Sequence, residues 1–239
     1  MHTDQVAQLF VEFADTLVDE FDLADFLHMV TTRTCEVVAT GAVGVLLGEQ
    51  EDRLQLVATS HGRPALVELF EVQAVEGPCR DCVRLRGPVD DPDLRHATAR
   101  WPRFAPLAVS AGFVSVHAFP LRLRTRVIGV LDVLRDVSGR MPSSEARVVQ
   151  ALADVVTIGI LQQRARRRSE ELSAQLQRAL DSRIVVEQAK GALAQLRGCT
   201  PDEAFEVLRD LARSNRLRLT DVASTLMAHP ERMRDLGER

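Results

Sequence analysis

Residues 114–135 read VSVHAFPLRLRTRVIGVLDVLR, and this stretch decides the fold of the larger part of the chain. Two mainly apolar runs, residues 114–123 and 127–135, are separated by only three residues. Short apolar runs that lie this close together predict a pair of neighbouring antiparallel strands. The sequence therefore predicts a β-sheet at the centre of the N-terminal part.

A second pair of strands and several helices are predicted around this hairpin. The strands are expected at residues 43–47 and 54–59, on either side of the turn-prone stretch 48–52. Apolar residues at helical spacing predict helices, and glycine and proline predict a loop-rich stretch between them. The helices are expected within residues 6–37, 63–70, 104–111 and 143–160, and the loop-rich stretch at 77–88 is followed by a short strand at Val89. Together these elements form an α+β domain with an antiparallel sheet and helices at both ends.

The composition excludes several classes of protein. The 239 residues are 46% apolar and 27% charged with a formal net charge of −4, which suits one large domain or two modest ones. Four cysteines are too few for a disulfide scaffold, and no apolar stretch reaches the roughly 18 residues of a membrane span. The N-terminus lacks a basic segment followed by an apolar one, so no signal peptide is expected. We therefore expect a cytoplasmic protein that does not enter a membrane.

The net charge changes sign along the chain. Residues 1–163 hold 15 arginines against 22 acidic residues, net −7, whereas residues 164–239 hold 14 arginines and one lysine against 12 acidic residues, net +3. An arginine cluster at residues 164–168 lies at this change. We predict an α+β domain at residues 1–163, a helical connector at 164–180 and an all-α domain at 181–239.

The C-terminal third is predicted to be helical throughout. Apolar residues recur at every fourth position, a spacing that suits one face of a helix and also a two-stranded coiled coil, and hence a homodimer. These residues are Leu172, Leu176, Leu180 and Ile184. The sequence TPDE at residues 200–203 is a capping box with proline at the first helical position, so it predicts the start of a second helix. A third helix is expected between Thr220 and Pro230.

The C-terminal sequence resembles the ANTAR domain over residues 170–232. The resemblance is carried by residues 183–193 (RIVVEQAKGAL), 200–205 (TPDEAF) and 219–223 (LTDVA), in this order and spacing. It implies a three-helix RNA-binding domain that captures paired small hairpins in nascent transcripts and prevents their termination.

The N-terminal part resembles a GAF sensory domain of the kind that is fused to ANTAR domains in actinobacteria. The similar stretches are residues 76–79 (EGPC), 101–104 (WPRF), 112–113 (GF), 120–123 (PLRL) and 128–131 (IGVL). This resemblance implies an antiparallel sheet with flanking helices and a domain that receives a signal, such as an unidentified small molecule.

Three basic residues of the C-terminal part form a candidate nucleic-acid contact. Arg183, Lys190 and Arg197 are seven residues apart, which places them in one row at intervals of about 10 Å along a helix. Such a row can contact RNA phosphates, and the alternative is that the long side chains cover the edge of a core with their stems. Gly191 permits close approach of RNA or of a second helix. The ANTAR resemblance favours RNA contacts. The predicted RNA-binding residues are Arg183, Lys190, Gly191, Arg197, Arg209 and Asn215, of which Lys190 is the only lysine and Asn215 the only asparagine of the chain.

Cys79 and Cys82 of the N-terminal part form a CxxC motif. The pair is a candidate redox switch in which Arg80 lowers the pKa of a thiol, and the alternative is that both cysteines are ordinary turn and core residues. A zinc site needs further ligands at a second metal-binding spacing, which the chain lacks, so no metal site is expected.

Three residues are candidates for lining a ligand pocket: Trp101, Phe113 and His117. His117 alternates with Val116 and Ala118 in a predicted strand, so it either contacts a ligand or is an ordinary core or edge histidine. No cofactor other than an unidentified small-molecule ligand is expected.

These observations favour a signal-responsive antitermination regulator that binds RNA hairpins under the control of the GAF-like domain, with RNA polymerase as a further partner. Two alternatives stay open, a DNA-binding transcription factor and an adaptor that senses redox state or a ligand and binds protein. No Ser-His-Asp set, enclosed carboxylate pair or glycine-rich phosphate loop is recognised, so we do not expect an enzyme.

Overall fold

The computed structural model describes residues 3–18, 21–38, 40–50 and 53–229. The chain divides into two compact units, Met1–Arg164 and Ala165–Arg239. The first unit is α+β and the second consists of helices, as the sequence predicts. The finer division of the second unit into a connector and a helical domain stays a prediction.

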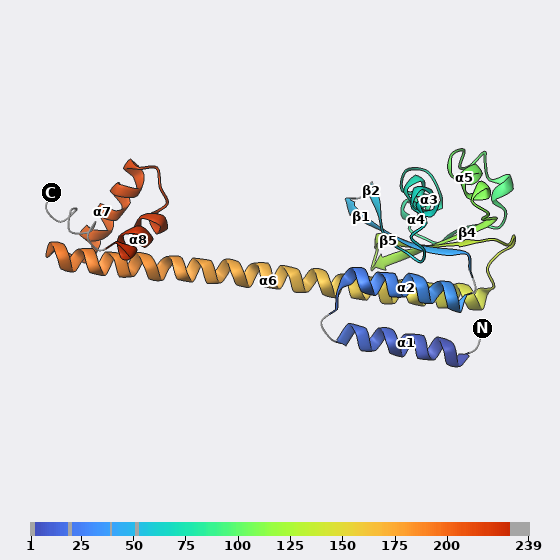
Figure 1. The fold of residues 1–239 in the computed structure, drawn as a ribbon, viewed down its shortest axis with the longest axis horizontal. Helices are drawn as coiled ribbons and strands as arrows, with labels where there is room; N and C mark the ends of the chain where they lie inside the picture. Colours follow the sequence, from blue (N-terminus) through green and yellow to red (C-terminus); the bar gives the residue numbers. More distant parts are fainter. Residues whose placement is uncertain (1–2, 19–20, 39, 51–52, 230–239) are drawn as a thin grey trace. The chain divides into compact units, whose positions relative to one another are not determined.

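The first unit contains a five-stranded antiparallel sheet (Figure 1). Its strands lie in the order β2-β1-β5-β4-β3. They are β1 (Ala42–Gln50), β2 (Arg53–Thr59), β3 (Val89–Asp91), β4 (Ser115–Leu123) and β5 (Arg126–Arg135). β4 and β5 form the predicted hairpin, in which Ser115 lies opposite Arg135 and Leu123 opposite Arg126. The predicted pairing of β1 with β2 and the short strand at Val89 are also confirmed.

One face of the sheet is covered by α2 (Leu23–Val37) and the N-terminal part of α6 (Ser143–Arg197), and α1 (Thr3–Val18) packs against α2 (Figure 1). Asp22 caps the N-terminus of α2, since its carboxylate accepts hydrogen bonds from the amides of Ala24 and Asp25. Apolar side chains of these helices and of the sheet form the first core. It includes Phe13, Phe26, Leu27, Phe119, Leu131 and Leu152.

The opposite face is covered by a layer of shorter helices. They are α3 (Pro64–Val75), α4 (Pro78–Leu85), the 3-10 helix η1 (Leu94–His96) and α5 (Phe104–Ser110). The loop expected at residues 77–88 is partly wrong, because α4 occupies most of it. Gly77 adopts a φ of +153° just before the helix, and Pro78 fits the first helical position, so the two residues that punctuate the sequence start a helix here. The buried residues of this second core include Phe70, Cys79, Cys82, Leu94, Trp101 and Phe104.

The described part of the second unit consists of the remainder of α6, α7 (Pro201–Ser214) and α8 (Leu219–Ala228). The predicted capping box starts α7, since the Thr200 hydroxyl accepts from the Glu203 amide at 3.3 Å and the Glu203 carboxylate accepts from the Thr200 amide at 2.8 Å. The three helices enclose a small core of their own. It includes Ala189, Leu193, Ala204, Leu208, Val222 and Leu226.

Candidate functional site

The structure places Arg183, Lys190 and Arg197 on one helix, α6, which ends at Arg197. At a rise of about 1.5 Å per residue, neighbouring members lie about 10 Å apart along the helix axis. These three residues, here called the basic row, border the core of the second unit, because Ala189 and Leu193 are fully buried. Arg183 is exposed, whereas Lys190 and Arg197 are partly buried.

The side chain of Lys190 lies at the boundary between the core of the second unit and solvent. It is 20% exposed, and its Nζ forms an ion pair with the carboxylate of Glu187 one turn earlier. The aliphatic stem therefore covers the edge of the core while the ammonium group remains at the surface. Packing by the stem and a phosphate contact by the charged end are compatible roles for this residue.

Gly191 lies beside Lys190 on an exposed part of α6. A Cβ atom built on it meets no other atom within 4 Å. Packing among the described residues therefore does not require a glycine here. A glycine inside a helix costs about 1 kcal/mol relative to alanine, so this position weakens α6 without a compensating contact inside the unit.

Arg209 and Asn215 lie on α7 and at its end, and both are exposed. Arg209 forms an ion pair with Glu206 of the same helix. The Asn215 side-chain amide donates to the carbonyl oxygen of Leu211 at 2.9 Å, so Asn215 helps to end α7. Of the six predicted RNA-binding residues, the structure places four on α6, and these two belong to the neighbouring helix.

An apolar stripe runs along α6 in the part that precedes the small core. Its four side chains are each more than half exposed and recur at every fourth residue. They are Leu172 (55%), Leu176 (58%), Leu180 (56%) and Ile184 (53%). Large exposed apolar side chains in a continuous series mark a surface that other apolar groups cover.

Cys79 and Cys82 are fully buried on α4. The Cys79 thiol donates to Oε1 of Gln73 at 3.1 Å. Burial raises the pKa of Cys79 well above its ordinary value and raises the pKa of Cys82 to about 12. The expected lowering by Arg80 is wrong, because desolvation dominates both thiols. This environment favours core residues over a reactive dithiol.

Trp101 and Phe113 belong to the second core, where they are 2% and 8% exposed. The indole Nε1 of Trp101 donates to Oδ2 of Asp81 at 3.2 Å, and the guanidinium of Arg100 lies 4.2 Å from the centre of the ring. Both aromatic side chains are thus used in packing. The structure does not bring them together with His117, which lines a pocket elsewhere.

The two GAF-like motifs EGPC and WPRF are joined by a hydrogen-bonded contact. Oε1 of Glu76 accepts from the backbone amide of Arg103 at 2.8 Å and from that of Phe104 at 3.4 Å. A carboxylate at the start of a helix satisfies amides that lack partners within it. Glu76 therefore fixes the start of α5 relative to the end of α3, which is a structural role.

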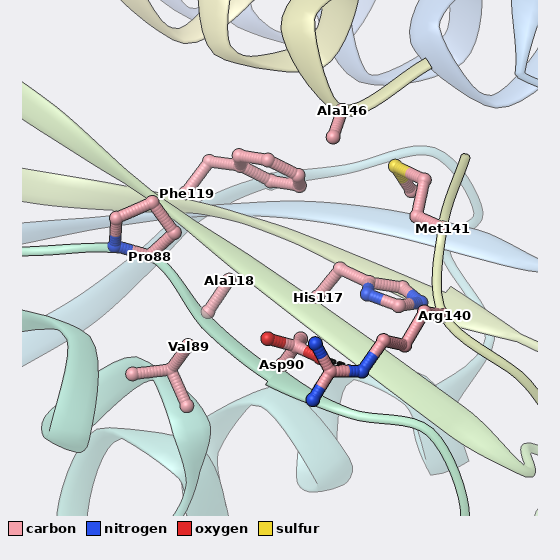
Figure 2. A pocket seen from close by; sticks show the side chains of 9 residues that line it. All are labelled: Pro88, Val89, Asp90, His117, Ala118, Phe119, Arg140, Met141 and Ala146. Carbon is pink, nitrogen blue, oxygen red and sulfur yellow. Dashed lines mark ion pairs between the residues drawn. The ribbon is translucent and has the colours of Figure 1, made fainter. Parts of the chain in front are cut away.

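His117 lies in β4 and lines a pocket at the edge strand β3, near the start of α6 (Figure 2). The pocket has a volume of about 170 Å³. Apolar walls are provided by Phe119, Met141 and other residues, and Figure 2 shows Arg140 and Asp90 beside the imidazole. Sequence reasoning missed Met141 and Arg140, whereas the alternation of a strand places Phe119 on the same side as His117.

The second feature that sequence reasoning missed is the completely buried Asp132 of β5. Its Oδ2 accepts a hydrogen bond from Nε2 of Gln73, and its Oδ1 has no partner. Desolvation raises the pKa of Asp132 to about 7. An acidic residue within the apolar run VLDVL was the available signal.

The described residues between 3 and 229 offer neither a metal site nor a membrane span. No group of three or more histidine, cysteine, aspartate or glutamate residues could hold a metal ion there. No helix in that part of the chain is long and apolar enough to cross a membrane.

A family model described as the GAF domain matches residues 4–161. The chain belongs to the GAF domain family. A second model, the ANTAR domain, matches residues 174–227, so the chain has a GAF–ANTAR architecture. The ANTAR domain implies RNA-binding regulation by antitermination, the GAF domain implies a sensory function, and the combination is regulatory rather than catalytic. No curated protein matches the chain.

Solved structures confirm the GAF fold of the first unit. The GAF domain of a phosphoenolpyruvate-protein phosphotransferase from Coxiella burnetii is 16% identical with a TM-score of 0.57, covering 70% of this chain and 98% of that chain. The corresponding domain from Acinetobacter is 18% identical with a TM-score of 0.54, covering 69% and 97%. The free methionine-R-sulfoxide reductase from Neisseria meningitidis, in complex with its substrate, is 20% identical with a TM-score of 0.53, covering 69% and 95%. Identities this low show the fold alone.

Proposed function

We propose that this GAF–ANTAR protein is a signal-responsive antitermination regulator that binds hairpins in nascent RNA through its second unit. The observation that carries the proposal is the basic row on α6 within the segment that matches the ANTAR domain. Three cationic side chains at intervals of about 10 Å can follow a phosphate backbone. The exposed, unobstructed Gly191 between them allows RNA to approach the helix closely.

The shape of the RNA hairpins contributes to recognition, because the small net positive charge of the second unit does not by itself give strong RNA binding. Residues 183–218 contain seven basic and five acidic residues, so the second unit is only mildly positive in this region. Phe205 is the only aromatic residue after Phe119, and its side chain is partly buried, so stacking on exposed aromatic rings contributes little. The phosphate contacts therefore set affinity, and the geometry of the paired hairpins sets selectivity.

We propose a homodimer that is held by the apolar stripe on α6. Residues 172, 176, 180 and 184 expose a continuous apolar face, and a second copy of the same helix would cover it in a coiled coil. Two copies of the second unit would match two hairpins of one transcript. Such a regulator acts in the cytoplasm, where it meets RNA polymerase during transcription.

The signal enters through the first unit as a small-molecule ligand of the GAF domain. α6 begins at Ser143, packs in the first core through residues such as Leu152, and carries the basic row further along the same helix. A change in the packing of its N-terminal part is therefore coupled to the helix that carries the RNA contacts. The proposed regulator acts through this coupling and needs no catalysis.

Binding of the full chain to a paired-hairpin RNA and to duplex DNA at matched salt tests the proposal. Lys190→Ala and Arg197→Ala should each weaken hairpin binding and reduce the salt dependence of the affinity by about one phosphate contact. Arg178→Ala, an exposed arginine of α6 outside the row, is the matched control. Equal binding of DNA and RNA, or unchanged hairpin affinity in both row variants, would refute the proposal.

A further inference from the structure

The pocket beside His117 contains a buried polar atom without a partner. His117 is 2% exposed, and its Nε2 forms no hydrogen bond in the structure. Figure 2 shows the imidazole extending toward Arg140 and Met141, which belong to the segment just before α6. A buried nitrogen without a hydrogen bond is destabilising, and a ligand that supplies the missing partner recovers that free energy.

The rest of the pocket is suited to an uncharged molecule. Phe119 and Met141 are 5% and 9% exposed and give it apolar walls. At its rim, Nε of Arg140 lies 3.9 Å from Oδ2 of Asp90, so the two charges at the opening are already matched. A charged ligand would compete with this pair, whereas a neutral ligand leaves it intact.

The imidazole itself is neutral at ordinary pH. Burial, together with the nearby charge of Arg135, lowers the pKa of His117 to about 4. A neutral imidazole whose other ring nitrogen carries the proton accepts a hydrogen bond at Nε2. A ligand hydroxyl satisfies Nε2 in this tautomer by donating a hydrogen bond to it.

The volume limits the ligand to a small molecule. The pocket measures about 170 Å³, and an engineered apolar cavity of about 150 Å³ binds benzene. One six-membered ring with a single substituent fits this space. The thioether of Met141 and the ring of Phe119 are favourable neighbours for an aromatic ligand.

We propose that this pocket is a binding site for a small, uncharged, hydroxyl-bearing ring compound of the phenol class, whose hydroxyl donates to Nε2 of His117. The site gives a chemical identity to the ligand of the sensory unit and rests on that part of the proposed function. Ala146 of the pocket lies on α6, three residues after Ser143, where the helix begins. A bound molecule therefore contacts the helix that also carries the basic row.

Titration of the full chain with phenol, benzene, benzoate and benzylamine, followed by NMR of the histidine imidazoles, tests the site. Phenol should shift the His117 resonances in a saturable way, and benzene should bind about threefold to tenfold more weakly because it lacks the hydrogen bond. Benzoate and benzylamine should show no saturable binding. Equal affinity for phenol and benzene, or tighter binding of either charged compound, would overturn the proposal.

Two variants locate the binding. His117→Leu should reduce phenol affinity to that of benzene, and Ala146→Leu, which fills the pocket, should weaken both by about tenfold or more. Ala174→Leu, at an exposed position of the same helix, is the control for Ala146→Leu. If His117→Leu does not fold, the preference of the unchanged protein for phenol over benzene and the weaker binding of both compounds by Ala146→Leu decide the question. Undiminished phenol binding in a folded Ala146→Leu protein refutes the site.

The test separates this site from RNA binding. Lys190→Ala should bind phenol as the unchanged protein does, and Ala146→Leu without ligand should retain hairpin affinity. Loss of hairpin binding with intact phenol binding would therefore count against the RNA function alone, and the reverse result would count against the pocket alone.

Discussion

Nε2 of Gln73 donates a 2.7 Å hydrogen bond to Oδ2 of Asp132, and both side chains are completely buried. The bond joins α3 to β5 through the second core of the GAF unit. The other oxygen of Asp132 has no partner, and burial raises the pKa of this carboxyl group to about 7. The protonation state of Asp132 therefore contributes directly to the stability of the sheet and the helix above it.

Asp132→Asn should change the pH dependence of stability. The pKa of Asp132 is raised in the folded state from 3.8 to about 7, so the free energy of unfolding of the unchanged protein falls as pH rises through this window. Asparagine is neutral throughout, so the variant should gain up to about 4 kcal/mol relative to the original protein at pH 8 and little at pH 4. Urea unfolding followed by the fluorescence of Trp101, the only tryptophan, measures this in the first unit. If the difference in the free energy of unfolding between the two proteins does not vary with pH, the pKa of Asp132 is not raised in the folded state.

The titration of His117 should change the stability of the protein in the opposite direction, so that stability falls as pH falls. Its pKa is lowered in the folded state from 6.5 to about 4 by burial, so its contribution to stability is complete above pH 6.5 and is lost as pH falls toward 4. His117→Leu should reduce the acid destabilisation between these values by up to about 3 kcal/mol. Urea midpoints from pH 7 to pH 4 provide the measurement.

The four cysteines should differ in their rates of alkylation. Cys79 and Cys82 are fully buried, whereas Cys35 and Cys199 are partly exposed. Burial raises the pKa of Cys79, Cys82 and Cys35, so access to the reagent is what distinguishes Cys35 from the buried pair. Reaction requires a thiolate that the reagent can reach. Mass spectrometry of the native protein after brief exposure to iodoacetamide should find label at Cys35 and Cys199 first. Rapid labelling of Cys79 and Cys82 would support the redox switch instead.

The sequence predicts the strands of the GAF unit well because each has a local signal. Residues 114–135 contain both halves of the hairpin and the link between them, and the capping box at Thr200 specifies the start of α7 within four residues. α4 was missed because Gly77 and Pro78 are typical of loops and helix starts alike, and only their backbone geometry separates the two.

The sites were less predictable because they depend on contacts between residues that are distant in sequence. Alternation along β4 indicates that His117 and Phe119 share a side, but nothing in the sequence places Met141 and Arg140 beside them. Aromatic residues such as Trp101 often line ligand pockets. In this structure, however, the Trp101 side chain lies in the core and donates a hydrogen bond to Asp81. The basic row was predictable because a single helix fixes all three of its members.

The apolar stripe predicts the oligomeric state. Leu176→Asp places a charge at the centre of the exposed apolar face of α6, which should destabilise a coiled coil and favour the monomer. Ala174→Asp introduces the same residue about half a turn away on the helix and should leave the dimer intact. Sedimentation equilibrium of the full chain over a range of concentrations measures the difference. A wild-type protein that is monomeric at every concentration contradicts the proposed homodimer.

Gly191→Ala separates helix stability from RNA binding at one position. The added methyl group meets nothing within 4 Å, so it should stabilise α6 by about 1 kcal/mol and slow hydrogen exchange of the amides around it. If RNA approaches the helix at Gly191, the same methyl group should weaken hairpin binding even though the protein is more stable. Lys190→Ala provides the comparison, because it removes a charge and should lower the salt dependence, whereas Gly191→Ala should lower affinity with the salt dependence unchanged. A stabilised variant with full hairpin affinity would show that RNA does not contact this part of α6.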